Sequence, residues 1–295
     1  MRVLVYGAKG WIGQQFIGTT THEVILGTAR AENYYEVVRE IKEHRPDTVC
    51  SFLGRTHGYD PSGNYIPTID YLELPGKEEE NHRDNFLAPI TLAEASRDNG
   101  VHFVYLGTGC IYTYRPEKDL FSEMDEPNFF GSAYSKMKGL TNQAMHRRPN
   151  ALQLRIRMPI SRNVSKRNLI DKLVGYKQIC SIPNSMTVLD DMWAPIDAMI
   201  AAKTTGTYNL VNPGVVDHSW ILTKYRDVVD PTHTWSEISY EDQMKILKSE
   251  RSNNELTTDK LEDFCADHGI PLPHIRTSIL HCLKDRALGM QPQTQ

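Results

Sequence analysis

The stretch that decides the fold is Met1-Arg-Val-Leu-Val-Tyr6, followed at once by Gly7-Ala-Lys-Gly10-Trp-Ile-Gly13. The apolar run predicts a short buried strand, and the glycine triplet predicts a tight turn into a helix. In this pattern Gly7 allows the turn, Gly10 lets the backbone approach a pyrophosphate, and Gly13 permits close packing of helix on strand. The pyrophosphate would lie at the positive end of the helix dipole. The alternative is a glycine-rich turn without a ligand, but its position directly after a strand favours dinucleotide binding.

The second expected strand, Glu23-Val-Ile-Leu-Gly27, bears on which dinucleotide is bound. A carboxylate at the end of this strand usually binds the ribose hydroxyls of NAD, whereas an arginine there accommodates the 2′-phosphate of NADP. Arg30 stands three residues after the strand, so we predict NADPH. An exposed arginine without a ligand is the alternative, and the nearby Glu32 leaves NAD open.

Strands and helices are expected to alternate along the first half of the chain. The expected strands are 2–6, 23–27, 47–53, 101–107 and 151–157, and the expected helices lie near 11–18, 33–44, 80–99 and 133–147. This alternation predicts an α/β fold, with a Rossmann-type doubly wound parallel sheet and a smaller C-terminal substrate-binding domain. Residues 1–157 would form the NADPH-binding domain. Residues 158–295 would form a discontinuous substrate-binding region that shares strands with it.

Residues 54–79 are rich in Gly, Pro, Tyr and Asp, and we expect them to form a long active-site loop. The net charge of the 295 residues is −4, without a basic block, so nucleic acid is not an expected partner. No apolar run approaches the roughly 18 residues of a membrane span, and the initial strand leaves no room for a signal peptide. Five scattered cysteines indicate reduced thiols, hence a cytoplasmic protein. Because Cys265-x-x-His268 and His281-Cys282 lack a matching second pair, no metal site is expected.

Three residues suggest carbonyl chemistry. Tyr134 and Lys138 are four apart, so on a helix their side chains share one face. The ammonium of Lys138 is then expected to lower the pKa of Tyr134 toward the range of a general acid. Thr108, at the end of a strand, would complete a carbonyl-reducing site. A solvated helix pair is the alternative for the Tyr and Lys.

Several segments together resemble a known family. These segments are residues 6–13, Thr108-Gly-Cys-Ile111, Pro127-Asn-Phe-Phe-Gly-Ser-Ala-Tyr-Ser-Lys-Met-Lys138, Arg155-Ile-Arg-Met-Pro-Ile160, Ile182-Pro-Asn-Ser-Met-Thr187, Asn212-Pro-Gly-Val-Val216 and Arg251-Ser-Asn-Asn-Glu-Leu256. With them the chain resembles the extended short-chain dehydrogenase/reductase family in its dTDP-4-dehydrorhamnose reductase branch, and within it the plant-type nucleotide-rhamnose synthases. The main departure is the loop after Gly54, which is longer than expected.

The resemblance implies a bifunctional enzyme that acts on UDP-4-keto-6-deoxy-glucose and assembles as a homodimer. It would epimerise the sugar at C3 and C5 and reduce the C4 ketone with NADPH. Cys110 and Lys172 match the family's epimerase pair, and Lys166 is a second candidate for the lysine. A thiol becomes a useful base once a nearby cation stabilises the thiolate. A buried structural thiol and an exposed helix lysine are the alternatives.

The resemblance also implies binding residues. For the cofactor these are Gly7, Lys9, Gly10, Trp11, Ile12, Gly13 and Arg30, together with Tyr134 and Lys138. For the substrate they are Asn128, Ser132, Asn184, Asn212, Arg251 and Asn254. Arg251 suits a diphosphate. Its segment has another interpretation, in which Ser252 or Asn253 starts a helix as its N-cap.

Two other functions remain possible at this level. One is a 4-keto-6-deoxy-sugar-nucleotide reductase without epimerase activity, which would not need Cys110 or Lys172. The other is a non-catalytic regulatory subunit with the same fold, because fold alone does not define function. The presence of Thr108, Tyr134 and Lys138 beside Cys110 favours the bifunctional enzyme. The preference between UDP and dTDP stays open.

Overall fold

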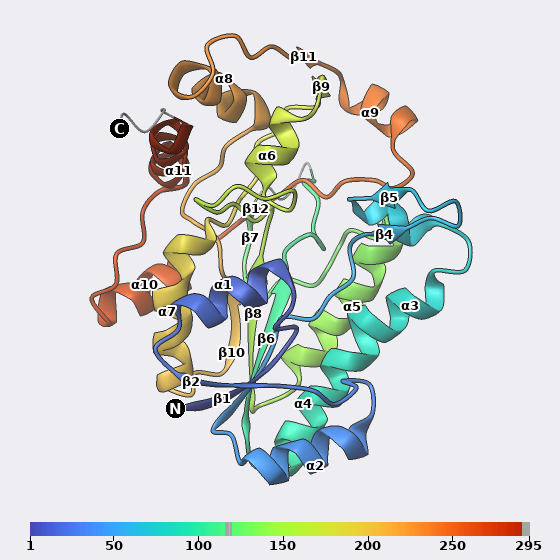
Figure 1. Cartoon of the computed structure of the whole chain (residues 1–295), viewed down its shortest axis with the longest axis vertical. Helices are drawn as coiled ribbons and strands as arrows, with labels where there is room; N and C mark the ends of the chain where they lie inside the picture. The colour runs from blue at the N-terminus through green and yellow to red at the C-terminus, as the bar shows by residue number, and fades with distance from the viewer. Residues whose placement is uncertain (116–117, 119, 291–295) are drawn as a thin grey trace.

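The computed structural model describes residues 1–115, 118 and 120–290, and its centre is a six-stranded parallel sheet (Figure 1). The strand order is β10-β8-β6-β3-β1-β2. These strands are β1 (Arg2–Tyr6), β2 (Glu23–Leu26), β3 (Thr48–Ser51), β6 (His102–Thr108), β8 (Ala151–Ile156) and β10 (Gly206–Asn209). Because β1 lies between β2 and β3, the order reverses there, and a crevice opens at the carboxyl ends of β1 and β3. The predicted doubly wound parallel sheet is confirmed.

Helices cover both faces of this sheet. On one face α1 (Trp11–Thr19), α7 (Leu189–Ala201) and α10 (Asp259–Asp267) bury Phe16, Trp193 and Leu261 against the strands. On the other face α2 (Tyr34–His44), α4 (Ala88–Asp98) and α5 (Ala133–His146) bury Ile41, Leu92 and Met145. The inner strands read as continuous apolar runs because both of their faces are buried.

The expected helix at 80–99 is interrupted. It consists of α3 (Glu78–His82), one π-helical turn η2 (Arg83–Leu87) and α4. Pro89 has no N–H to donate to the carbonyl of Asn85, and the Thr141 hydroxyl donates to that carbonyl instead, at 2.7 Å. The Asn85 side chain in turn bonds the backbone N–H and C=O of Arg55, at 3.0 and 2.9 Å. The irregular turn therefore fixes the start of the 54–79 loop.

The 54–79 loop has secondary structure of its own. Strands β4 (Gly58–Tyr59) and β5 (Tyr65–Ile66) form an antiparallel hairpin, and η1 (Ile69–Glu73) is a 3-10 helix. The sequence predicted an irregular segment, because a two-residue strand leaves no periodicity to detect. In Figure 1 this hairpin lies on the right, below α9 of the second lobe, and Asp70 of the same loop accepts a hydrogen bond from the backbone N–H of Lys248 in that lobe at 2.9 Å.

The second lobe is built mostly from residues beyond 158. It contains α6 (Leu169–Val174), α8 (His218–Val228), α9 (Tyr240–Ile246), α11 (Ile275–Met290), and the small strands β7 (Leu120–Phe121), β9 (Gln178–Ile179), β11 (Ser236–Glu237) and β12 (Glu255–Leu256). Its core packs Ile170, Val188, Ile221 and Ile279 together. Between its segments the chain returns to the main sheet as α7 and β10. We retain the division at 157/158 as a proposal. Within the described residues, no helix has the length and apolar character needed to cross a membrane.

Candidate active site

One cavity of about 890 Å³ runs from the sheet edge into the second lobe. We call its two parts the strand end and the distal end. The strand end contains Thr108, Cys110, Tyr134 and Lys138, and the distal end contains His57, Arg167, Lys172 and Arg251. The cavity therefore brings together all five predicted catalytic residues, which come from the end of β6 and the turn after it, from α5 and from α6.

The glycine turn borders this cavity where β1 meets α1. Gly7 has φ +82°, a conformation that favours glycine, and a Cβ there would lie 2.8 Å from the Phe52 carbonyl carbon. A Cβ on Gly13 would lie 2.3 Å from the carbonyl oxygen of Gly7. Gly10 starts α1 and lines the cavity. The helix N-terminus is thus open toward the space where a pyrophosphate would bind.

The other predicted cofactor residues lie around this turn. Trp11 and Ile12 line the cavity, whereas Lys9 and Arg30 are exposed and lie outside the lining. Arg30 belongs to the loop after β2. Thr28, two residues earlier in this loop, donates its backbone N–H and its hydroxyl to the buried carboxylate of Glu40, at 2.7 and 2.6 Å. Hydrogen bonds of this kind lower the pKa of Glu40 against the effect of burial. The loop is therefore fixed while the Arg30 side chain remains free to meet a ligand.

Tyr134 and Lys138 lie one turn apart on α5, as predicted. The Lys138 Nζ atom is 5.9 Å from the centre of the Tyr134 ring, and it donates a 2.9 Å hydrogen bond to the hydroxyl of Tyr105. Lys138 is 4% exposed, and burial lowers its pKa from 10.5 to about 7. The strand end thus holds a lysine whose positive charge is easily lost.

The pKa of Tyr134 differs from the sequence prediction. Burial raises this pKa, the proximity of Cys110 adds to the rise, and a hydrogen bond with the Thr108 side chain lowers it only in part. The predicted lowering by Lys138 is absent because the lysine is itself desolvated and directed to Tyr105. Tyr134 is accordingly protonated at neutral pH, which is the state that a proton donor requires.

Cys110 lies in the turn directly after β6 and is only half-buried. Its backbone N–H donates to the Thr108 hydroxyl at 3.0 Å, and its carbonyl accepts from the Ser135 hydroxyl at 2.7 Å. The buried guanidinium of Arg157 donates to the carbonyl of Gly109 at 3.0 Å and so fixes the same turn. The thiol is therefore held at the cavity surface, and the alternative of a fully buried structural thiol is wrong.

The structure separates the two candidate lysines. Lys172 on α6 lines the cavity, and its Nζ atom lies 3.5 Å from the carbonyl oxygen of Pro67. Burial and the charges of Arg167 and Arg251 lower its pKa. Lys166 is exposed and lies outside the cavity lining. Of these two candidates, only Lys172 lies in the same cavity as Cys110.

Arg251 lines the distal end, but it already has an anionic partner. It forms an ion pair with the buried carboxylate of Asp70, and it donates to the carbonyl of Ser249 at 2.9 Å. The alternative in which Ser252 or Asn253 caps a helix is wrong, since the next helix, α10, begins at Asp259.

Five predicted substrate-binding residues lie outside the cavity lining: Asn128, Ser132, Asn184, Asn212 and Asn254. Their side chains bond the protein itself. The Asn254 amide donates to the carbonyls of Gly109 and Tyr112 at 3.1 and 2.9 Å. Asn128 bonds the backbone of Thr113, Ser132 caps α5, and Asn212 accepts from the N–H of Val188. Asn184 accepts from the guanidinium of Arg157. In this structure these side chains are bonded by the protein itself, and their contact with substrate stays a prediction.

Several cavity residues were not named by the sequence analysis, and two of them, His57 and Arg167, contact each other. His57 comes from the 54–79 loop and Arg167 from the segment before α6. The Arg167 Nη1 atom lies 2.8 Å from the Nδ1 atom of His57. These residues are 110 positions apart and match no motif, so only the folded chain reveals the pair.

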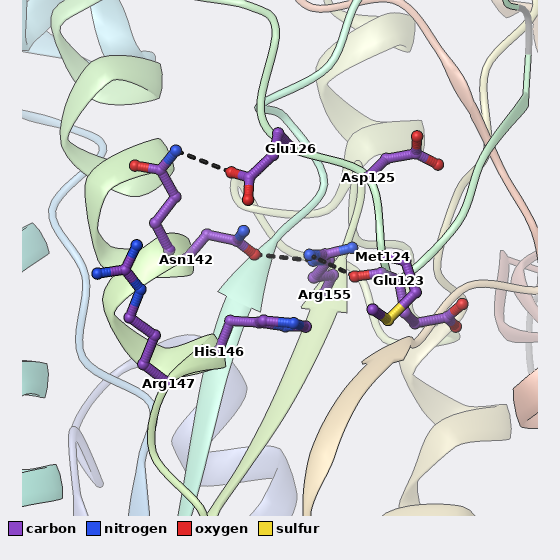
Figure 2. A pocket seen from close by; sticks show the side chains of 9 residues that line it. Glu123, Met124, Asp125, Glu126, Asn142, His146, Arg147 and Arg155 are labelled. Atoms are coloured by element: carbon purple, nitrogen blue, oxygen red, sulfur yellow. Dashed lines mark hydrogen bonds between the residues drawn. The ribbon is translucent and has the colours of Figure 1, made fainter.

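A second, smaller pocket of about 110 Å³ lies elsewhere, beside α5 and β8 (Figure 2). Its floor is Arg155, which is 1% exposed and donates to the side chain of Asn142 at 2.8 Å and to the carbonyl of Glu123 at 3.2 Å. Because these polar groups bond one another, we assign this pocket a structural role. Among the described residues no group of three or more His, Cys, Asp or Glu side chains is placed to hold a metal ion.

The doubly wound sheet, the glycine turn, and Thr108, Tyr134 and Lys138 at the ends of β6 and α5 define an extended short-chain dehydrogenase/reductase. The comparison with solved structures agrees. The L780 UDP-rhamnose synthase from Acanthamoeba polyphaga mimivirus superposes with a TM-score of 0.90 and 44% identity, over 97% of this chain and 99% of that one. A dTDP-4-dehydrorhamnose reductase from Clostridium acetobutylicum shares the fold, with a TM-score of 0.78 and 17% identity over 98% of this chain and 100% of that one.

Sequence similarity gives the family. The bifunctional dTDP-4-dehydrorhamnose 3,5-epimerase/reductase of Arabidopsis thaliana is 37% identical over 269 residues, which are 88% of this chain and 86% of the relative. No family model matches the sequence. The chain belongs to the UDP-rhamnose synthase family, whose members are epimerase/reductases of nucleotide-rhamnose synthesis.

Proposed function

We propose that this protein is a bifunctional 3,5-epimerase and NADPH-dependent 4-reductase that converts UDP-4-keto-6-deoxy-D-glucose to UDP-L-rhamnose. The observation that carries the proposal is the common cavity of Cys110 and Lys172 with Thr108, Tyr134 and Lys138. A reductase that received an already epimerised sugar would need only the last three. The names of the relatives support the same pair of activities.

The glycine turn fits the pyrophosphate of NADPH, because side chains on Gly7 and Gly13 would collide with backbone atoms beside it. We propose that Lys9, Gly10, Trp11 and Ile12 contact the cofactor along α1. Arg30 would bind the 2′-phosphate, because a guanidinium can make two parallel hydrogen bonds to it. When bound there, NADPH supplies the hydride that reduces the C4 ketone.

For reduction, Tyr134 is the proton donor to the C4 oxygen. Burial raises its pKa, so the phenol carries its proton at neutral pH. Thr108 donates a hydrogen bond to the same oxygen and helps to hold it beside the phenol. Lys138, whose pKa is about 7, holds the cofactor ribose and restores the proton of Tyr134.

For epimerisation, one group removes the proton from C3 or C5 and another returns a proton to the opposite face of the carbon. The 4-keto group makes these protons acidic, since the electron pair of the broken C–H bond moves onto the ketone oxygen. We assign removal to the Cys110 thiolate and return to the Lys172 ammonium. The lowered pKa of Lys172 suits proton transfer near neutrality.

The test is to incubate purified protein with UDP-4-keto-6-deoxy-glucose and NADPH in D₂O, and to identify the product. UDP-L-rhamnose with deuterium at C3 and C5 supports both activities. Reduction without deuterium at these carbons would leave a reductase only. Parallel assays with the dTDP-sugar and with NADH determine the nucleotide and cofactor preferences. In Lys172→Met the exchange should be lost, whereas Lys166→Met should retain it.

We also propose a cytoplasmic homodimer. The five cysteines of the chain are all unpaired thiols, which suits a reducing compartment. Light scattering after size-exclusion chromatography tests the dimer, and fractionation of the source cells tests the compartment.

A further inference from the structure

The distal end of the cavity gathers three cationic side chains that come from two remote segments. Arg167 and Lys172 belong to the start of the second lobe, and Arg251 lies about 80 residues later. Burial and the neighbouring cations lower the pKa of Lys172, and burial together with the charge of Arg55 lowers that of Arg167. Collecting positive charge in a partly buried space costs free energy unless an anion balances it.

Asp70 balances only one of these cations. Its carboxylate pairs with the guanidinium of Arg251, and it also accepts from the backbone N–H groups of Lys248 and Ser249 at 2.9 and 3.0 Å. Hydrogen bonds from the side chains of Thr68, Arg251 and Ser249, together with the charge of Arg251, lower the pKa of Asp70 despite its burial, so the carboxylate is charged. Arg251 and Asp70 together contribute no net charge to the cavity.

Arg167 and Lys172 have no such partner. Across residues 1–115, 118 and 120–290, no carboxylate lies within the 4.0 Å ion-pair distance of either side chain. The partner of Arg167 is His57, and burial together with the charges of Arg167, Arg55 and Lys172 lowers the pKa of that imidazole to about 4. A neutral imidazole can accept a hydrogen bond but cannot cancel a positive charge. Arg167 therefore keeps its full charge and is fixed in orientation.

We propose that Arg167, oriented by His57, binds the diphosphate of the nucleotide-sugar substrate, and that Arg251 does not supply the charge for this contact. The inference deepens the proposed function, because it rests on a nucleotide-sugar occupying this cavity. The pyrophosphate of the cofactor belongs at the glycine turn between β1 and α1, whereas Arg167 comes from the segment before α6. A guanidinium suits the role because both of its terminal nitrogens contact the His57 ring, and the second N–H of each, together with the Nε–H, can donate to phosphate oxygens.

The experiment measures the affinity of the purified protein for two probes, UDP and uridine, by titration calorimetry. Arg167→Gln should weaken UDP binding by about 10-fold or more, as expected for the loss of charge-assisted hydrogen bonds, and should change uridine binding by less than about 2-fold. Arg167→Lys keeps the positive charge but lacks the planar guanidinium, so its loss of UDP affinity should be smaller than that of Arg167→Gln. If Arg167→Gln does not fold, Arg167→Lys still tests the inference.

The matched control removes the balanced pair as a unit. Arg251→Gln alone would leave Asp70 as an unpaired negative charge that repels phosphate, so the control is the double variant Asp70→Asn/Arg251→Gln. It leaves the net charge of the cavity unchanged, and UDP affinity should stay within about 3-fold of the unmodified protein. His57→Phe should weaken the binding of UDP but not of uridine. His57→Asn, which keeps a hydrogen-bond acceptor, should retain part of the UDP affinity that His57→Phe loses.

Three results would overturn the inference: unchanged UDP affinity in both Arg167 variants, an equal loss for uridine, or a greater loss in the double variant than in Arg167→Gln. None of these measurements needs catalysis. A protein that binds UDP through Arg167 but makes no rhamnose would refute the proposed function alone. A protein that makes UDP-L-rhamnose with unchanged UDP binding in Arg167→Gln would refute this inference alone.

Discussion

The strand end and the distal end of the cavity both contain cationic side chains that are at least partly buried. These side chains differ in how readily they lose their positive charge. At the strand end Lys138 lies on a regular helix, packs against Tyr105 and has a pKa of about 7. At the distal end Arg167 sits between a loop and a short helix, and its guanidinium stays charged beside the neutral His57. The first arrangement suits the movement of protons, and the second suits the binding of an anion.

The comparison also separates the two proposed reactions. The groups for reduction all belong to the strand end. Epimerisation uses Cys110 from the strand end and Lys172 from the distal end. Substitutions at the strand end and at the distal end should therefore have different effects on reduction and on epimerisation.

The largest effect is expected for Tyr134→Phe, which removes the proposed proton donor and little volume. We expect kcat for reduction to fall by about 10²–10⁴-fold, the range for loss of acid–base catalysis, with little change in UDP binding. Steady-state kinetics following NADPH absorbance measures this. Tyr176→Phe removes a hydroxyl from the cavity lining at the distal end and is the control. Near-normal reduction by Tyr134→Phe would contradict the assignment of Tyr134, at the strand end, as the proton donor.

The next largest effect is expected for Cys110→Ser, which replaces the thiol with a much weaker acid of nearly the same shape. Deuterium incorporation at C3 and C5 in D₂O should slow by about 10²-fold, while the variant still reduces a supplied L-configured ketone. Mass analysis of the product gives the result. Cys180→Ser changes a thiol elsewhere in the lining and should exchange normally. Normal exchange in Cys110→Ser would favour the reductase-only function.

The variant Lys138→Met tests whether the ammonium group of Lys138 is buried at the strand end, through its effect on the stability of the protein. In the unfolded chain the lysine has a pKa of about 10.4, whereas in the folded protein it is about 7. Between these values the unfolded state binds more protons, so this group makes the protein more stable as the pH rises from about 7 to 10.

The Lys138→Met protein without cofactor should therefore be more stable by about 1–3 kcal/mol at pH 7, and this gain should shrink toward pH 10. Urea unfolding at the two pH values measures it. Lys136→Met, on the exposed side of the same helix, should show neither effect. A gain that is independent of pH would mean that Lys138 is not desolvated as described.

The smallest effect is expected outside the cavity, at the exposed Arg30. Arg30→Ala should lower kcat/KM for NADPH by about 5- to 10-fold and leave that for NADH unchanged, because an exposed guanidinium contact with phosphate is screened by solvent. Arg39→Ala on α2 is the control. Equal efficiency of the two cofactors in the unmodified protein would remove the argument for NADPH.

Much of the strand end could be predicted because it follows from local patterns. The β1 strand and glycine turn fix α1, and the four-residue spacing of Tyr134 and Lys138 places both on one helix face. The strand boundaries agreed within one or two residues. The protonation states of Lys138 and Tyr134 could not be predicted this way, because their pKa shifts are caused mainly by burial, which depends on the packing of the whole fold. The hydrogen-bond partner of Lys138, Tyr105, lies 33 positions away in the chain.

The distal end could not be predicted, because no single segment contains it. The strand β10 is only four residues long, and the hairpin of the 54–79 loop has two-residue strands, so neither leaves a periodic pattern. The asparagines of the family-like segments were expected at the substrate, and in the structure their side chains bond backbone and side-chain groups of the protein itself. Whether an amide faces a ligand or a carbonyl depends on what packs against it.

The sequence by itself therefore determined the class of fold, the dinucleotide turn and the chemical identity of Thr108, Cys110, Tyr134 and Lys138, since these depend on residue type and spacing along one strand or helix. Only the tertiary structure decided that Lys172 rather than Lys166 shares their cavity, that Asp70 balances Arg251, and that Arg167 faces a neutral His57. The physical reason is that charge balance depends on the three-dimensional proximity of charged groups. It is set by which side chains lie within a few ångströms of one another, and here those side chains are separated by 110 and 181 positions in the chain.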